Sequence, residues 1–414
     1  MRTVVSIVSV STLALAAAGC GSPSKPGTGT GTGTGNCDTA TATLSAGASS
    51  TPLSHRAYIV SRDSDDLTVI DLDKLEILGN METCGEGDHM AELNADFSKI
   101  YVDSPGTHES IVIDAQTLAV TKRIQLGAET THISLSKDGK LLGIVNEWDN
   151  SVSFVDPVKD VEVKRLDGFY LPHFVRWAPD NKYAYVANLE AHHITRIDLA
   201  TLSIDAEIPL DGYGVPPATP ALTTESGFAD VQIDKDGVLY AAHAETGRVL
   251  VYDTKTLTKL PELHVGNQPW IVYAEHPFMT IPHHVVPNFG DQTVSMIAPS
   301  PLAVSGTASG ADQQSFGVNY SPLVPNEAFV MNRFKNEVAV IDTTSGSKIA
   351  DIPVGGTTET ASTTADGKYI VAAVSSANSV VVIDATTNTV VKTFPNVGKY
   401  PWSVTIPAGQ NYCH

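Results

Sequence analysis

Histidines are the residues of this chain whose type and placement could do chemistry. The sequence has 13 of them, and several stand immediately before a short apolar run, as in ETTHISL at 129–135 and LPHFV at 171–175. A neutral imidazole is a good ligand for iron, copper and zinc. Whether His89, His132 and His173 can act together depends on the elements that carry them.

The stretch 131–166 predicts one four-stranded antiparallel unit, because its four apolar runs are separated by segments containing Asp-Gly, Asp-Asn and Asp-Pro. The third run ends in Phe154-Val155-Asp156, and copies of it recur along the chain. They end at Asp71, Asp114, Asp198, Asp253, Asp342 and Asp384, with a degenerate copy at Ala298. The intervals between successive copies are 43, 42, 42, 55, 45, 44 and 42 residues. This period predicts an all-β fold, an eight-bladed β-propeller.

The two ends of the repeat predict how the ring closes. After His55 the chain enters directly into a second strand, and 403–406 has the pattern of a first strand with nothing after it. Pairing of these N- and C-terminal strands would complete one blade and leave no free sheet edge between the first and last blades. The Pro-rich segment 211–227 and the Ser/Gly/Ala-rich segment 299–316 are predicted to be inserted loops.

The N-terminus has the features of a secretory signal peptide over residues 1–19. LALAAAGC at 13–20 resembles the bacterial lipobox, in which Cys20 would become the lipid-modified first residue. Residues 20–51 are rich in Gly, Ser and Thr and predict a flexible tether, so the propeller is assigned to 52–414. These features predict a protein of the bacterial cell envelope that is held to the membrane by its N-terminal lipid.

Charge and cysteine usage restrict the partners further. The formal net charge of −20 argues against nucleic acid, which needs a positive field. An oxidising compartment favours one disulfide among Cys37, Cys84 and Cys413, and the pairing stays open. Alternatively, Cys84 and His89 on one loop could bind copper or zinc.

The repeat at 354–393, VGGTTETASTTADGKYIVAAVSSANSVVVIDATTNTVVKT, resembles that of the YVTN-type β-propellers. Eight blades with histidines at the blade entrances resemble the cytochrome d1 haem domain and its relatives in d1-haem biosynthesis. The resemblance is carried by ETTHISLSKDGK, by YLPHFVRWAPDNKYAYVANLEAHHITRID and by HPFMTIPHHVVPNFGDQTVSMI. It implies a d1-type haem or another tetrapyrrole, with His132 at the haem-ligating position. Asn288 and Trp270 stand where the nitrite reductases carry two active-site histidines, and CxxCH is absent, so nitrite reduction is not implied.

Propeller geometry predicts that the first strands start at one mouth of the central channel, on the face that also carries the loops between second and third strands. The first-strand positions are His89, His132, Phe174, Asp230, Trp270, Asn319, Thr360 and Trp402, with His173 beside Phe174; the loops add Arg62, His108, Trp148, His192, His193, His243, His283, His284 and Arg333. From this face we expect the ligand-binding residues to be His89, His132, His173, His243, Trp270, Trp402, Arg62 and Arg333, with His89 and His132 as metal ligands.

Three interpretations of this face follow. The histidines could hold a haem-like tetrapyrrole or a copper or zinc ion, with the tryptophans against a macrocycle and the arginines pairing its carboxylates. The aromatic rim could instead dock a protein partner of the envelope as a non-enzymatic scaffold. A single histidine at a strand start could also simply cap a backbone carbonyl. No GxSxG, HExxH or P-loop motif is present, so an enzymatic role, a dehydrogenase-like step in d1-haem biosynthesis, rests on resemblance alone.

Overall fold

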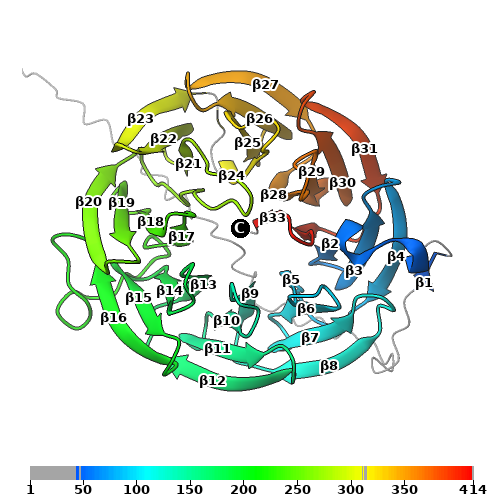
Figure 1. Cartoon of the computed structure of the whole chain (residues 1–414), viewed down its shortest axis with the longest axis horizontal. Helices are drawn as coiled ribbons and strands as arrows, with labels where there is room; N and C mark the ends of the chain where they lie inside the picture. Colours follow the sequence, from blue (N-terminus) through cyan, green and yellow to red (C-terminus); the bar gives the residue numbers. More distant parts are fainter. Residues whose placement is uncertain (1–42, 46–47, 310, 312–314, 413–414) are drawn as a thin grey trace, which may run out of the picture. The chain divides into compact units, whose positions relative to one another are not determined.

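The computed structural model describes residues 43–45, 48–309, 311 and 315–412. The described residues form eight antiparallel sheets, which follow one another around a common centre, as Figure 1 shows. This confirms the predicted eight-bladed β-propeller. In the described residues no helix is long and apolar enough to cross a membrane.

Blades 1 to 4 run from the inner to the outer strand as follows. Blade 1 consists of β32 (Pro401–Thr405), β2 (Arg56–Ser61), β3 (Asp66–Asp71) and β4 (Glu76–Glu82), with β1 (Thr43–Leu44) on the outer edge. Blade 2 consists of β5 (Ala91–Leu93), β6 (Lys99–Ser104), β7 (Glu109–Asp114) and β8 (Val120–Gln125). Blade 3 consists of β9 (Thr130–Leu135), β10 (Leu142–Asn146), β11 (Ser151–Asp156) and β12 (Val161–Asp167), and blade 4 of β13 (Pro172–Trp177), β14 (Tyr183–Asn188), β15 (His193–Asp198) and β16 (Ser203–Pro209).

Blades 5 to 8 follow the same order. Blade 5 consists of β17 (Gln232–Ile233), β18 (Val238–His243), β19 (Arg248–Asp253) and β20 (Thr258–His264), and blade 6 of β21 (His284–Asn288), β22 (Thr293–Pro299) and β23 (Leu302–Ser309). Blade 7 consists of β24 (Ser315–Tyr320), β25 (Glu327–Asn332), β26 (Glu337–Asp342) and β27 (Ser347–Pro353). Blade 8 consists of β28 (Thr358–Thr363), β29 (Tyr369–Val374), β30 (Ser379–Asp384) and β31 (Thr389–Pro395), with β33 (Gln410–Tyr412) on the inner edge. In blade 6 the segment 269–273 takes the inner place through two isolated bridges to β21. In the part of the chain that the structure describes, three short 3-10 helices lie at Ala48–Ser50, Leu53–His55 and Ser375–Ala377.

The aspartate that marks the repeat closes the hairpin between third and fourth strands. In blade 3 the Asp156 carboxylate accepts hydrogen bonds from the backbone N–H groups of Val158 and Lys159, at 2.9 and 3.0 Å. Asp384 does the same in blade 8 with Thr386 and Thr387. A side chain that mimics the backbone in this way fixes a tight turn, which is why Asp recurs at the strand end.

The ring closes as predicted, because β32 pairs with β2 in register Ile59 to Val404. The prediction that nothing follows this strand is wrong. The chain continues into β33, which adds to the inner edge of β28. The side chain of Gln410 explains the placement, because its Oε1 accepts the backbone N–H of Tyr320 in blade 7 at 2.8 Å. A short polar strand such as this has no apolar alternation by which to recognise it.

The two predicted insertions differ in outcome. Residues 211–227 contain no strand, as predicted. The prediction of a loop at 299–316 is wrong, since β23 is the outer strand of blade 6 and pairs with β22. An outer strand is half exposed, so small and polar residues suffice there and its composition resembles that of a loop.

Adjacent blades are held together by apolar side chains between their faces. Between blades 3 and 4, the rings of Phe154 and Trp177 are 6.1 Å apart in an edge-to-face arrangement. The indole N–H of Trp177 donates to Ser134 Oγ at 2.8 Å, so this large side chain is buried without an unpaired donor. Such packing fixes the angle between blades and thereby the positions of residues at the channel.

Candidate functional site

Three histidines from consecutive blades meet at the channel mouth. His89 precedes β5, His132 lies in β9 and His173 lies in β13. The ring centroids of His89 and His132 are 4.8 Å apart, and those of His132 and His173 are 4.2 Å apart. All three are almost completely buried. We call His89, His132 and His173 the channel histidines.

Backbone carbonyls fix the orientation of two of these rings. His89 Nδ1 lies 2.9 Å from the carbonyl oxygen of Thr131, and His173 Nδ1 lies 2.7 Å from that of Ala229. A carbonyl only accepts, so in both rings Nδ1 carries the proton and Nε2 carries the lone pair. A carbonyl bonded to one ring nitrogen is the usual way in which a protein orients the other toward a ligand.

A carboxylate joins the channel histidines. Glu147 follows β10 directly, and its Oε1 lies 3.5 Å from His132 Nδ1. Thr131 Oγ1 donates to the same Oε1 at 2.8 Å and lies 3.1 Å from His132 Nδ1. One ligand atom each from His132, Glu147 and His173 fall within 4.8 Å of one another. The cluster therefore has the donors of a small transition-metal site.

Burial keeps this cluster close to neutral. It lowers the pKa of His89 well below the ordinary value, and the neighbouring His132 lowers it further. Burial also raises the pKa of Glu147 to about 7, against the opposing effect of His173. A neutral imidazole such as that of His89 keeps a lone pair for a metal, and a bound cation would balance the charge of the ionised Glu147 carboxylate.

Aromatic side chains frame the channel histidines on both sides. The Trp402 ring lies 5.4 Å from that of His89, and the Trp270 ring lies 6.2 Å from that of His173. Both tryptophans are buried, with exposed fractions of 1% and 3%. They pack in the interior, whereas Trp148 and Phe334, on loops between second and third strands, are more than half exposed. A protein partner on this face would therefore meet Trp148 and Phe334.

The head groups of the two predicted arginines contact other side chains, although the charge of Arg62 contributes to lowering the pKa of His89. Arg62 lies over the rings of Tyr400 and Trp402, 4.4 and 4.9 Å from their centroids. Arg333 forms an ion pair with Glu359 at 2.6 Å. Arg333 is thus already compensated by a buried carboxylate.

His243 belongs to a different group of side chains. Its Nε2 lies 3.1 Å from His192 Nδ1, and its ring contacts that of Phe228. His283 and His284 were assigned to a loop between second and third strands, and this assignment is wrong. His284 begins β21, the second strand of its blade, and its Nε2 lies 3.8 Å from Asp234 in the first turn of blade 5, on the opposite face. The prediction failed here because the inner segment of blade 6, residues 269–273, is irregular, so counting along the repeat placed these histidines at the wrong end of the strand.

Cys84 is disulfide-bonded. The alternative in which its thiolate binds a metal with His89 is therefore wrong, since an oxidised sulfur offers no thiolate. Cys37 and Cys413 lie outside the described residues, so the pairing among Cys37, Cys84 and Cys413 stays open. Cys20, the predicted lipid-bearing residue, also lies outside them.

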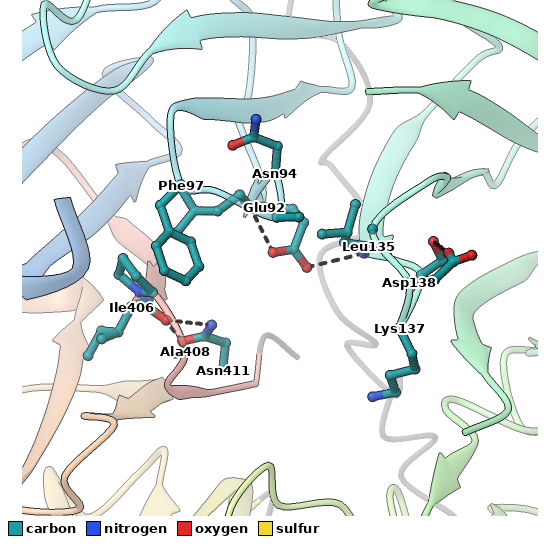
Figure 2. A pocket seen from close by; sticks show the side chains of 14 residues that line it. Glu92, Asn94, Phe97, Leu135, Lys137, Asp138, Ile406, Ala408 and Asn411 are labelled. Carbon is teal, nitrogen blue, oxygen red and sulfur yellow. Dashed lines mark hydrogen bonds between the residues drawn. The ribbon is translucent and has the colours of Figure 1, made fainter. Parts of the chain in front are cut away.

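The opposite face carries a pocket of about 340 Å³ between blades 2 and 3 and the C-terminal segment (Figure 2). Glu92 lies at its centre and accepts the backbone N–H groups of Leu93 and Leu135, at 2.8 and 3.4 Å. Lys137 and Asn411 lie on opposite sides of it. No histidine is among the residues that line this pocket.

Sequence reasoning missed Glu147 and Thr131. The loop Glu147-Trp148-Asp149-Asn150 was considered only for its tryptophan. The available signal was position: Glu147 begins a loop between second and third strands, so it faces the same mouth as His132. Thr131 was missed because the sequence analysis took one first-strand residue per blade at the channel mouth, and in this blade that residue was His132.

No protein-family model and no curated protein matches the chain. Solved structures do resemble it. Dihydro-heme d1 dehydrogenase NirN, in complex with DHE, has a TM-score of 0.70 at 16% identity over 86% of this chain and 76% of that one. AztD from Citrobacter koseri has a TM-score of 0.59 at 13% identity over 84% and 96%. Hydrazine synthase from Kuenenia stuttgartiensis has 0.54 at 19% identity over 72% and 96%. At these identities the likeness establishes the fold alone, a β-propeller.

Proposed function

We propose that this protein binds a transition-metal ion, zinc or copper, at the channel mouth through His132, His173 and Glu147, with His89 beside them. The convergence of these ligand atoms within 4.8 Å carries the proposal.

The surroundings support the same conclusion. Thr131 Oγ1 is bonded to the Glu147 carboxylate and lies next to His132 Nδ1, so it would hold both ligands in place. Outer contacts of this kind orient metal ligands and raise affinity. A mixed nitrogen and oxygen donor set with no thiolate favours zinc or copper(II) over softer ions.

A tetrapyrrole is the other ligand implied by the fold, and the site fits it less well. The rings of His132 and His173 are in direct contact, with centroids 4.2 Å apart. A planar macrocycle between the channel histidines would require these rings to separate. Arg333, which could have paired a haem carboxylate, is held by Glu359. A single ion needs none of these changes.

The test is metal titration of the full chain, purified in detergent, by calorimetry with Zn²⁺ and with Cu²⁺. His132→Ala should weaken binding at this site by more than about a hundredfold, because loss of an outer contact alone costs about 10–100-fold. His284→Ala is the matched control, since it removes an equally buried histidine from the other face. Unchanged affinity in His132→Ala would reject the assignment. Haem added in parallel should give no ligated Soret band, and a strong band lost in His132→Ala would favour the tetrapyrrole.

We further propose that the protein is a lipoprotein of the bacterial cell envelope, anchored through Cys20. The apolar segment before the lipobox-like sequence and the disulfide at Cys84 support this, because disulfides persist in oxidising compartments. Cys20→Ser should move the protein from the membrane to the soluble fraction after cell fractionation. Retention of this variant in the membrane would refute the anchor.

A further inference from the structure

A second group of metal-ligating side chains lies between blades 4 and 5. His192 is in the turn before β15, His243 ends β18, and Glu245 is in the turn that follows. His192 Nδ1 lies 3.1 Å from His243 Nε2 and 3.8 Å from Glu245 Oε2. The three ligand atoms fall within 4.8 Å of one another. None of these residues belongs to the channel-mouth cluster.

The two imidazoles are brought together with little room to move. Their rings are stacked with centroids 5.0 Å apart and an angle of 25°. His243 is fully buried, and its Nδ1 lies 3.1 Å from Thr246 Oγ1. That contact leaves Nε2 directed at His192, which is the orientation that a shared ion requires.

The long connection between blades 4 and 5 supplies a wall for this cluster. Tyr213, within 211–227, stacks on His192 at a centroid distance of 4.0 Å. The backbone N–H of Leu222 donates to the backbone carbonyl oxygen of Glu190, two residues before His192, at 2.8 Å. The interval of 55 residues that interrupts the regular repeat is thus used to cover these histidines.

The electrostatic surroundings tolerate a cation. Burial and the mutual effect of the two rings lower the pKa of His243 to about 3, so it is neutral at physiological pH. Arg248 is the nearby positive charge, and it is compensated by Glu262 at 3.0 Å. Glu245 is half exposed and would face an incoming ion from solvent.

We propose that His192, His243 and Glu245 form a second binding site for a zinc or copper(II) ion, separate from the channel mouth. Two imidazoles and one carboxylate with a further position open to solvent are the donors of an accessible zinc site, not of a closed structural one. An ion held here would exchange with solvent more readily than one among the buried channel histidines.

The experiment is Zn²⁺ binding to the full chain in detergent, with stoichiometry measured by equilibrium dialysis and affinity by calorimetry. Wild type should bind two ions. His192→Ala should lose one ion and keep the other, whereas His132→Ala should lose the other, so that the two sites fail independently. His108→Ala is the matched control, because His108 also lies in a loop between second and third strands and is part of neither cluster.

A second variant covers the case in which His192→Ala does not fold. Glu245→Gln changes a half-exposed side chain and should weaken the same site by at least about tenfold. Copper(II) at this site should show two coordinating nitrogens by electron paramagnetic resonance in the His132→Ala background. Unchanged stoichiometry and affinity in His192→Ala, or in Glu245→Gln, would overturn the proposal whether or not the channel mouth binds metal.

Discussion

Gly398 lies where the last blade passes to the strand that closes the ring. Its φ is +123°, a conformation that L side chains rarely adopt. A Cβ here would run into Ser61 Oγ and the Asp66 carboxylate of blade 1, far inside van der Waals distance. The neighbouring Val397 carbonyl accepts hydrogen bonds from Ser61 Oγ and Thr68 Oγ1, at 3.1 and 2.8 Å. The first and last blades can therefore pack this closely only because residue 398 is a glycine and has no side chain.

The cost of Gly398→Ala has two parts, and Gly168 separates them. Gly168 has a φ of +104°, but its Cβ would meet only Ile204 Cδ1, at an ordinary 3.7 Å. Backbone strain of about 1–3 kcal/mol is common to both substitutions. Overpacking adds about 1–3 kcal/mol at Gly398 alone. We therefore expect Gly398→Ala to be less stable than Gly168→Ala by about 1–3 kcal/mol.

The assay is urea unfolding followed by tryptophan fluorescence, with midpoints compared among wild type, Gly398→Ala and Gly168→Ala. Both variants should unfold at lower urea than wild type, and Gly398→Ala at the lowest. Equal midpoints for the two variants would show that the closing contact relaxes without cost. Wild-type stability in Gly398→Ala would refute the reasoning that closure depends on this glycine.

Two further predictions concern buried charge. Arg56 is fully buried and donates to the carbonyl oxygens of Ala115, Ala48 and Thr51, at 2.8, 2.6 and 3.0 Å. Arg56→Met should lower the free energy of unfolding by about 2–4 kcal/mol because three buried acceptors lose a charged donor. As a control, Arg165→Met replaces a partly exposed arginine and should change the free energy of unfolding by less than about 1 kcal/mol. Equal urea midpoints for the two variants would contradict this prediction. Burial raises the pKa of Glu92, so its stabilising contribution is complete below the usual value of 4.5 and is lost as pH rises through the folded-state pKa. Between pH 4.5 and the folded-state pKa of Glu92, the Tm of Glu92→Gln should therefore fall less steeply than that of wild type. Parallel plots of Tm against pH for wild type and Glu92→Gln would argue against a raised pKa of Glu92.

Much of the fold could be read from local signals. Asp156 and its six true copies end third strands because their carboxylates close the next turn, and this interaction lies within three residues of chain. The count of blades and the pairing of β32 with β2 followed from that repeat. β23 and β33 were missed because an outer strand and an added inner strand need no apolar alternation. In β33 the stabilising neighbours are also distant in sequence, such as Tyr320 for Gln410.

In the regular blades the sequence by itself determined which residues stand at the entrances, because a repeat fixes the place of each residue within its own blade. It misplaced His284 in blade 6, whose inner segment is irregular. It placed His89, His132 and His173 on one face but could not give the distances between them. Only the tertiary structure decided that His132 meets Glu147 and His173, and that His243 turns to His192. Those distances depend on the angle between packed blades and on side-chain orientation, which are set by contacts such as Phe154 against Trp177 across blades and not by the order of residues along one strand.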